Sequence, residues 1–148
     1  MRILIERPPL WEEINAKFNV EGQSVIFAWG DTIYNPEGVK VSRELHAHEE
    51  IHGERQLAYP AASSSPGEPE DHVVEWWKRY IEDPKFRLEE ELPAHRAEYQ
   101  AFCKRHGDQK SRAKMLTLIA AKLTSPLYGS LITLEDARYR IIRREVDE

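Results

Sequence analysis

The chain has 148 residues, of which 41% are hydrophobic and 32% are charged, and its formal net charge is −5. These values are typical of a folded globular domain. They argue against a disordered chain and against nucleic acid as the main partner. No apolar run approaches the roughly 20 residues that a membrane-spanning helix needs, so no membrane partner is expected.

Two further features indicate a protein of the cytoplasm. The amino-terminal stretch MRILIERPPLWEE holds three consecutive apolar residues followed by charged ones, which does not fit a signal peptide. The single cysteine, Cys103, cannot form an internal disulfide bond, as expected in a reducing compartment. Its place in a helical pattern predicts a structural thiol, with a nucleophilic thiol as the alternative.

The first part of the chain predicts one helix followed by short strands. Residues 8–18 begin with two prolines and carry apolar residues at three- and four-residue spacing, which predicts a helix. Residues 24–29 and 31–35 are rich in β-branched and aromatic side chains and predict a hairpin or a bent strand pair around Gly30. A further short strand is predicted at 39–42.

A helix and then a loop are predicted next. Ser42 is a suitable N-cap for a helix over 43–59. Residues 60–71, PAASSSPGEPED, are rich in proline and serine and predict a flexible surface loop. Because the segment before this loop is too small to be stable alone, we expect one domain over residues 1–148.

The remainder of the chain predicts helices at 72–82, 84–106 and 111–125, and a last helix that starts at Thr133. Pro93, inside the second of these, predicts a kink or a break. The expected fold class is therefore α+β and mostly helical, with the few strands gathered in the first third of the chain.

The stretch ELHAHEEIHGERQ contains the pattern H-E-x-x-H at His48, Glu49 and His52. Residues four apart lie on one face of a helix, so both imidazoles can be directed at one zinc ion. Glu49 is rotated by about 100° from His48 and can take a proton from a zinc-bound water, whose pKa the metal lowers. His46 faces another side and is expected to cap the helix or lie at its surface. The alternative is a surface helix whose histidines are merely polar.

Two histidines do not complete a catalytic zinc site, which normally has three protein ligands. The extended pattern H-E-x-x-H-x-x-G-x-x-H is excluded, because Arg55 and Ala58 stand where it needs glycine and histidine. The remaining solution is a glutamate on a later helix, and FRLEEELPAHRAEY supplies several.

Glu91 is the expected third ligand, because the small Ala94 one turn further on would let two helices approach closely. Glu90 and Glu98 remain alternatives, since these carboxylates point in different directions around the helix. The acidic residues at the start of this helix can also serve only to stabilise it, as solvated side chains near its amino end.

At this point the sequence resembles the zincin metallopeptidases of the glutamate-ligand type, the gluzincins. HEEIH matches their zinc motif, and ELPAH is similar to their E-x-x-A-D pattern, with His95 where aspartate is common. FAWGDTIYNPEG, WWKRYIEDPKFRLEEELPAHRAEY and SPLYGSLIT also resemble small metallopeptidase-like proteins of bacteriophages and prophages. The resemblance implies a zincin-like core with a small sheet, an H-E-x-x-H helix and a glutamate-bearing helix, plus C-terminal helices.

The resemblance also implies roles in substrate binding. An edge strand of zincins binds extended peptides by main-chain pairing, and FAWGDTIYNP, which contains Trp29 and Gly30, is the candidate here. The alternative is a hairpin that only packs on the helices. Tyr128 is a candidate for stabilising an oxyanion, with a core or surface tyrosine as the alternative.

The expected function is that of a cytoplasmic zinc-dependent hydrolase, a peptidase acting on a peptide or protein. His48, His52 and Glu91 would bind Zn²⁺, and Glu49 would be the catalytic base. For a phage-encoded chain the location would be the host cytoplasm or the virion. One alternative is a non-catalytic zincin-fold structural or accessory phage protein that keeps zinc for stability, and another is a metal-free helical interaction domain. The substrate specificity, the oligomeric state and the role of the Trp76–Trp77 pair stay open.

Overall fold

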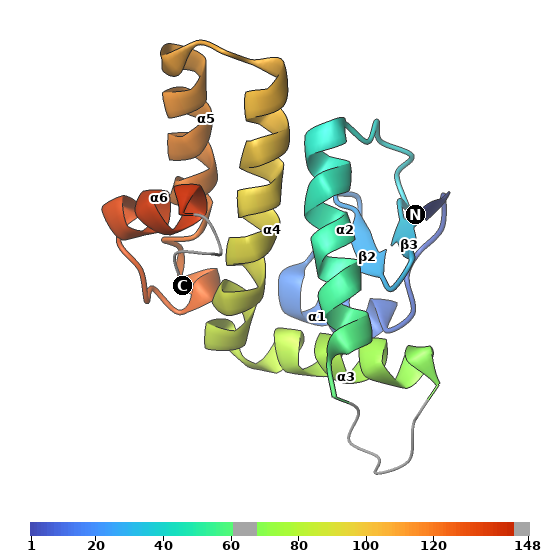
Figure 1. Cartoon of the computed structure of the whole chain (residues 1–148). Helices are drawn as coiled ribbons and strands as arrows, with labels where there is room; N and C mark the ends of the chain where they lie inside the picture. Colours follow the sequence, from blue (N-terminus) through green and yellow to red (C-terminus); the bar gives the residue numbers. More distant parts are fainter. Residues whose placement is uncertain (61–67, 144–148) are drawn as a thin grey trace. The chain divides into compact units, whose positions relative to one another are not determined.

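The computed structural model describes residues 1–60 and 68–143 (Figure 1). Helices make up 63% of it, so the predicted class, α+β and mostly helical, is confirmed. The zincin-like core and the single domain over 1–148 stay predictions. None of the helices in the described ranges is long and apolar enough to cross a membrane.

The chain forms two compact units. The first joins Met1–Val41 to Glu49–Asp83, and the second joins Ser42–His48 to the described residues from Pro84 onward. Helix α2 (Arg43–Ala58) therefore contributes its first six residues to the second unit and the rest to the first. Its cap is the predicted one, because the Leu45 N–H donates to Ser42 Oγ at 3.1 Å.

The first unit contains a three-stranded sheet and two further helices. Their bounds are β1 (Arg2–Leu4), α1 (Trp11–Phe18), β2 (Phe27–Trp29), β3 (Thr32–Tyr34) and α3 (Pro69–Glu82). The strand order is β1-β3-β2, with β2 antiparallel and β1 parallel to the central β3. The predicted hairpin is thus confirmed. Strand β1 is not predicted from the sequence, because a strand of three residues beside charged ones is too short to show an alternation of apolar and polar side chains.

The strand predicted at 39–42 is wrong. The side chain of Asn35 takes the place of a strand partner here: Nδ2 donates to the Val39 carbonyl at 2.8 Å, and Oδ1 accepts from the Val39 N–H at 2.9 Å. An asparagine amide often holds the backbone of a turn in this way. The β-branched composition of VKVS was therefore outweighed by a local side-chain bond.

The loop predicted over 60–71 ends earlier than expected. Residues 61–67 lie outside the described part of the chain, and α3 already begins at Pro69. Glu68 and Asp71 form a reciprocal capping box at its start, in which the Glu68 N–H donates to Asp71 Oδ2 at 3.2 Å. Charged residues that composition assigns to a loop therefore serve to start a helix.

An aromatic core holds the first unit together. Trp76 and Trp77 of α3 are 1% and 6% exposed, which places this pair in the core. The Trp77 ring lies 6.3 Å from Phe27 and 6.4 Å from Trp29, and the Trp76 ring stacks on Tyr80 at 4.9 Å. Such ring pairs stabilise a fold beyond the area that they bury. Helix α3 is thereby packed on the hairpin.

Gln56 binds the hairpin to α2 within the first unit. Its side chain is fully buried, and its amide accepts from the Gly30 N–H at 2.7 Å and donates to the Ala28 carbonyl at 3.0 Å. The Trp77 indole donates to the same carbonyl at 3.1 Å. These bonds satisfy backbone groups that would otherwise be buried without partners.

The second unit consists of helices packed on an apolar core. They are α4 (Pro84–Arg105), α5 (Gln109–Lys122), the short η1 (Pro126–Tyr128) and α6 (Leu134–Ile142). In Figure 1, α4 and α5 run side by side and are joined at one end. The core lies between them and α6, and its buried members are Leu88, Leu92, Leu116, Ile119, Ala120, Leu123, Ile132, Ala137 and Ile141. The helices predicted for this region are confirmed, with ends that differ by up to three residues.

Pro93 does not break α4, which is continuous from Pro84 to Arg105. Proline removes one backbone hydrogen bond from a helix interior. Here the residues on either side, Leu92 and Ala94, are 2% and 0% exposed. Burial of this face stabilises the helix more than the missing bond weakens it.

We predict that Gly53→Ala destabilises the protein by about 1–3 kcal/mol. A Cβ at this position in α2 would overlap the backbone oxygen of Gly30. Gly107→Ala is the matched control, because nothing lies within 4 Å of its added Cβ, and it should change stability by less than about 1 kcal/mol. Urea unfolding of both variants measures the difference, and equal stability of the two would contradict the close helix–hairpin approach.

Candidate metal centre

Four ionisable side chains meet inside the second unit. His48 comes from the start of α2, and Glu91, His95 and Glu98 come from α4. The α4 residues are spaced by four and three positions, so they share one helix face. All four are 5–8% exposed. Charged groups are seldom buried to this extent unless they are paired with one another or bind a metal.

Glu91 faces both histidines. Its Oε1 lies 3.0 Å from Nε2 of His48 and 3.6 Å from Nε2 of His95. The two imidazoles meet edge to face, with centroids 4.5 Å apart. One ligand atom from each of the three side chains lies within 4.8 Å of the other two, and the group could hold a metal ion.

Glu98 lies on the opposite side of the same rings. Its Oε1 accepts from Nδ1 of His48 at 2.9 Å and from Nδ1 of His95 at 3.0 Å. Burial alone raises the pKa of the Glu98 carboxyl, but the hydrogen bonds from the two histidines outweigh it and lower that pKa to about 2. Glu98 is therefore ionised at neutral pH and acts only as an acceptor.

His95 is held in its neutral form. Burial lowers the pKa of its imidazole below the ordinary value, and the hydrogen bond to Glu98 opposes this shift only in part. Metal ligation requires the neutral imidazole, because the lone pair must be free of a proton.

The chemistry of the group fits a divalent cation. Two imidazole nitrogens and one carboxylate oxygen converge, and each can offer a lone pair when the imidazoles carry no hydrogen on Nε2. Lone pairs at this spacing repel one another unless a proton or a metal ion lies between them. Histidine and glutamate together are a usual ligand combination for zinc and for other divalent transition metals.

The structure brings together two of the predicted zinc ligands, His48 and Glu91. His52 belongs to the first unit, where its ring lies edge-on to Trp76 and Tyr80, with centroids 5.5 and 6.4 Å apart. Glu49 also belongs to the first unit and is 7% exposed. The ligand role of His52 and the catalytic role of Glu49 stay predictions from the H-E-x-x-H spacing.

The glutamates of α4 differ in what they face. Glu89 is exposed, whereas Glu90 is buried on the same helix. Glu91 faces the Nε2 atoms of the histidines and Glu98 faces their Nδ1 atoms. Within the part of the chain that the structure describes, Glu91 is the carboxylate grouped with the two histidines.

His95 is the member of this group that the sequence did not predict. In the sequence it stands where the E-x-x-A-D pattern has aspartate. Its spacing of four residues from Glu91 places it on the same face, which was the available signal. What could not be read from the sequence is its contact with His48, since the two rings are far apart along the chain.

The predicted substrate-binding residues lie in packed surroundings. Trp29 is 6% exposed and stacks on Trp77, and the Gly30 N–H is bonded to Gln56. These contacts favour a packing role for the hairpin, and its pairing with a substrate stays a prediction. Tyr128 is half-buried against the apolar core of the second unit, and its catalytic role also stays a prediction.

Comparison of the chain with models of known protein families, with curated protein sequences and with solved structures gave no match. The function is therefore inferred from the geometry of the site and from the H-E-x-x-H motif.

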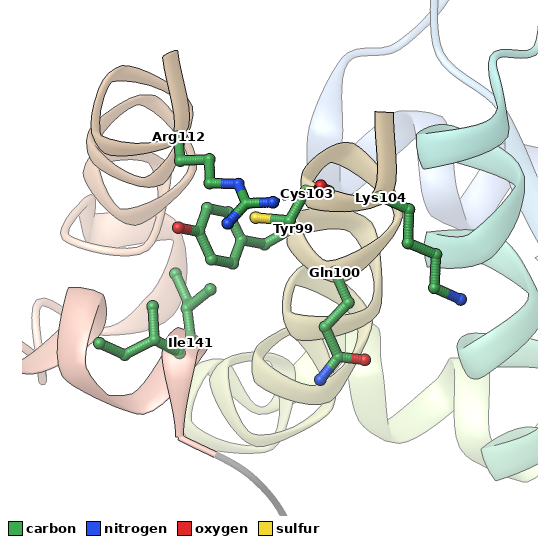
Figure 2. A pocket seen from close by; sticks show the side chains of 7 residues that line it. Tyr99, Gln100, Cys103, Lys104, Arg112 and Ile141 are labelled. Carbon is green, nitrogen blue, oxygen red and sulfur yellow. Dashed lines mark hydrogen bonds between the residues drawn. The ribbon is translucent and has the colours of Figure 1, made fainter. Parts of the chain in front are cut away.

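Cys103 borders a separate cavity of about 420 Å³ in the second unit. Figure 2 shows Arg112 reaching from α5 towards Cys103 and Tyr99 of α4. The Arg112 guanidinium donates to the carbonyls of Cys103 at 2.7 Å and His106 at 2.6 Å, which satisfies the end of α4. Burial raises the pKa of the Tyr99 phenol, and its hydrogen bond with the Cys103 thiol raises it further. These contacts agree with a structural thiol.

We predict that the metal-free protein loses stability as the pH falls below 6.5, and that His95→Gln removes part of this loss. The folded-state pKa of His95 lies below its ordinary value of 6.5, so the unfolded chain binds a proton first as the pH falls. The stabilisation is complete above pH 6.5 and declines towards the lower, folded pKa. Urea unfolding from pH 7.5 to 5 with a chelator measures it. His106→Gln, at an exposed histidine, should retain the wild-type dependence.

Proposed function

We propose that this protein is a zinc-dependent hydrolase that cleaves a peptide bond. The observation that carries the proposal is the buried approach of Glu91 Oε1 to Nε2 of His48, at 3.0 Å. His48 opens an H-E-x-x-H motif, and Glu91 is the carboxylate that the motif requires from a later helix.

The ligand set supports zinc among the divalent metals. Zinc accepts histidine nitrogen and carboxylate oxygen, and catalytic zinc sites keep three protein ligands with one open position. When bound, zinc would supply Lewis acidity and would make a water molecule acidic enough to react near neutral pH. His48 and Glu91 provide two ligands. The second imidazole is His95 in the described group, or His52 by the spacing of the motif.

Glu49 is the proposed general base. It follows His48 directly in α2 and is 7% exposed, so its carboxylate is largely shielded from bulk water. In this role it would accept a proton from the attacking water and later deliver it to the leaving nitrogen. A positioned carboxylate of this kind contributes about 10²–10⁴-fold to the rate.

The ligand set is tested by zinc binding to four variants. We expect Glu91→Gln and His48→Gln to weaken zinc binding by more than the 10–100-fold that the loss of an outer-shell partner costs. Isothermal titration against a competing chelator measures the affinity. His95→Gln and His52→Gln identify the second imidazole, because the variant that removes a ligand should lose as much as His48→Gln. Full zinc affinity of Glu91→Gln would contradict the proposed site.

The enzyme is tested by Glu49→Gln, which should lower peptide hydrolysis by about 10²–10⁴-fold while zinc remains bound. Glu54→Gln, at an exposed glutamate five residues further along α2, is the control and should keep wild-type activity. Hydrolysis is followed by mass spectrometry on a broad peptide panel. Equal inactivity of the zinc-loaded wild type and Glu49→Gln would exclude a peptidase and favour zinc as a structural ion.

A further inference from the structure

We infer that Glu98 is a positioning residue, which keeps a hydrogen on Nδ1 of both His48 and His95 and so reserves both Nε2 atoms for a metal ion. The inference deepens the proposed function. It depends on that function only for its effect on zinc affinity, because the position of the hydrogens is a property of the metal-free protein as well.

The geometry assigns the hydrogens of both rings. A single oxygen of Glu98 lies 2.9 Å from Nδ1 of His48 and 3.0 Å from Nδ1 of His95. One carboxylate oxygen that lies between two ring nitrogens can accept a hydrogen from each of them, so this placement points to a hydrogen on Nδ1 of both imidazoles. Hydrogen bonds from neutral groups to a buried charge are among the stronger ones in proteins, because the surroundings do not screen them.

Glu91 lies near Nε2, the other nitrogen of each ring, and could accept a hydrogen there. Its distance from Nε2 differs between the two rings. For His95, Glu91 lies at 3.6 Å, which is too long for a good hydrogen bond, against 3.0 Å for Glu98. For His48 the two carboxylates are nearly equidistant, at 3.0 Å and 2.9 Å. Without Glu98, the hydrogen of His48 would therefore move to Nε2 and bond to Glu91.

A hydrogen on Nε2 of His48 would prevent metal binding. It would occupy the nitrogen that binds the metal and would form a hydrogen bond to the Glu91 carboxylate beside it. Partners that orient metal-binding histidines typically change metal affinity by about 10- to 100-fold when they are removed. Glu98 contacts two imidazoles at once, one from α2 and one from its own helix α4.

The experiment is ¹⁵N NMR of histidine side chains in the metal-free full-length chain at neutral pH. The wild type should show a hydrogen on Nδ1 of both His48 and His95. Glu98→Gln should lose it at His48 and show a hydrogen on Nε2 of that ring instead. Glu91→Gln should retain Nδ1–H on both rings, because it weakens only the competitor. Glu89→Gln, at an exposed glutamate of α4, should leave both rings unchanged.

Zinc titration completes the test, with an affinity loss of about 10- to 100-fold for Glu98→Gln and no change for Glu89→Gln. Absence of Nδ1–H from either ring of the wild type would overturn the inference, even if Glu98→Gln failed to fold. An unchanged His48 in a folded Glu98→Gln would overturn it as well. If the wild type shows both Nδ1 hydrogens but binds no zinc, the proposed function fails while the assignment of the hydrogens stands.

Discussion

The second unit buries a charged carboxylate, and this burial constrains how its helices meet. Glu98 is 8% exposed and ionised, and removing a charge from water is costly unless other groups replace the lost hydration. The hydrogens of His48 and His95 do so, which requires the first turns of α2 and the middle of α4 to meet in one geometry. The apolar core formed by α4, α5 and α6 holds α4 in place for this purpose.

Three of the same four side chains form the group that could hold a metal ion. Glu98 lies at the Nδ1 atoms of the two rings, and Glu91 lies at their Nε2 atoms, where lone pairs repel one another unless a proton or a metal ion lies between them. In the first unit, polar burial has a different outcome. There the uncharged amide of Gln56 bonds to the backbone of Ala28 and Gly30. Helix α2 thus carries both kinds of buried polar contact.

Much of the fold could be predicted because its causes are local. Proline at the first position of α4, Thr133 before α6 and the apolar spacing of α5 act within a few residues. The features that the sequence did not predict, or predicted wrongly, depend on distant parts of the chain or on contacts that oppose the local pattern. Strand β1 exists only through its partner β3, the segment 39–42 is held by the side chain of Asn35, and the continuity of α4 through Pro93 depends on burial of its neighbours.

For the site, the sequence by itself determined the two histidines of the motif on one helix, Glu49 beside them, and a later helix with several carboxylates. These features could be read from the sequence because the spacing of residues along a helix determines the direction in which each side chain points. Only the tertiary structure decided that Glu91 and Glu98 address opposite nitrogens of the same rings and that His95 joins His48. The reason is that neighbouring glutamates on a helix are alike in every local respect. They differ only in what the packing of the chain places opposite them.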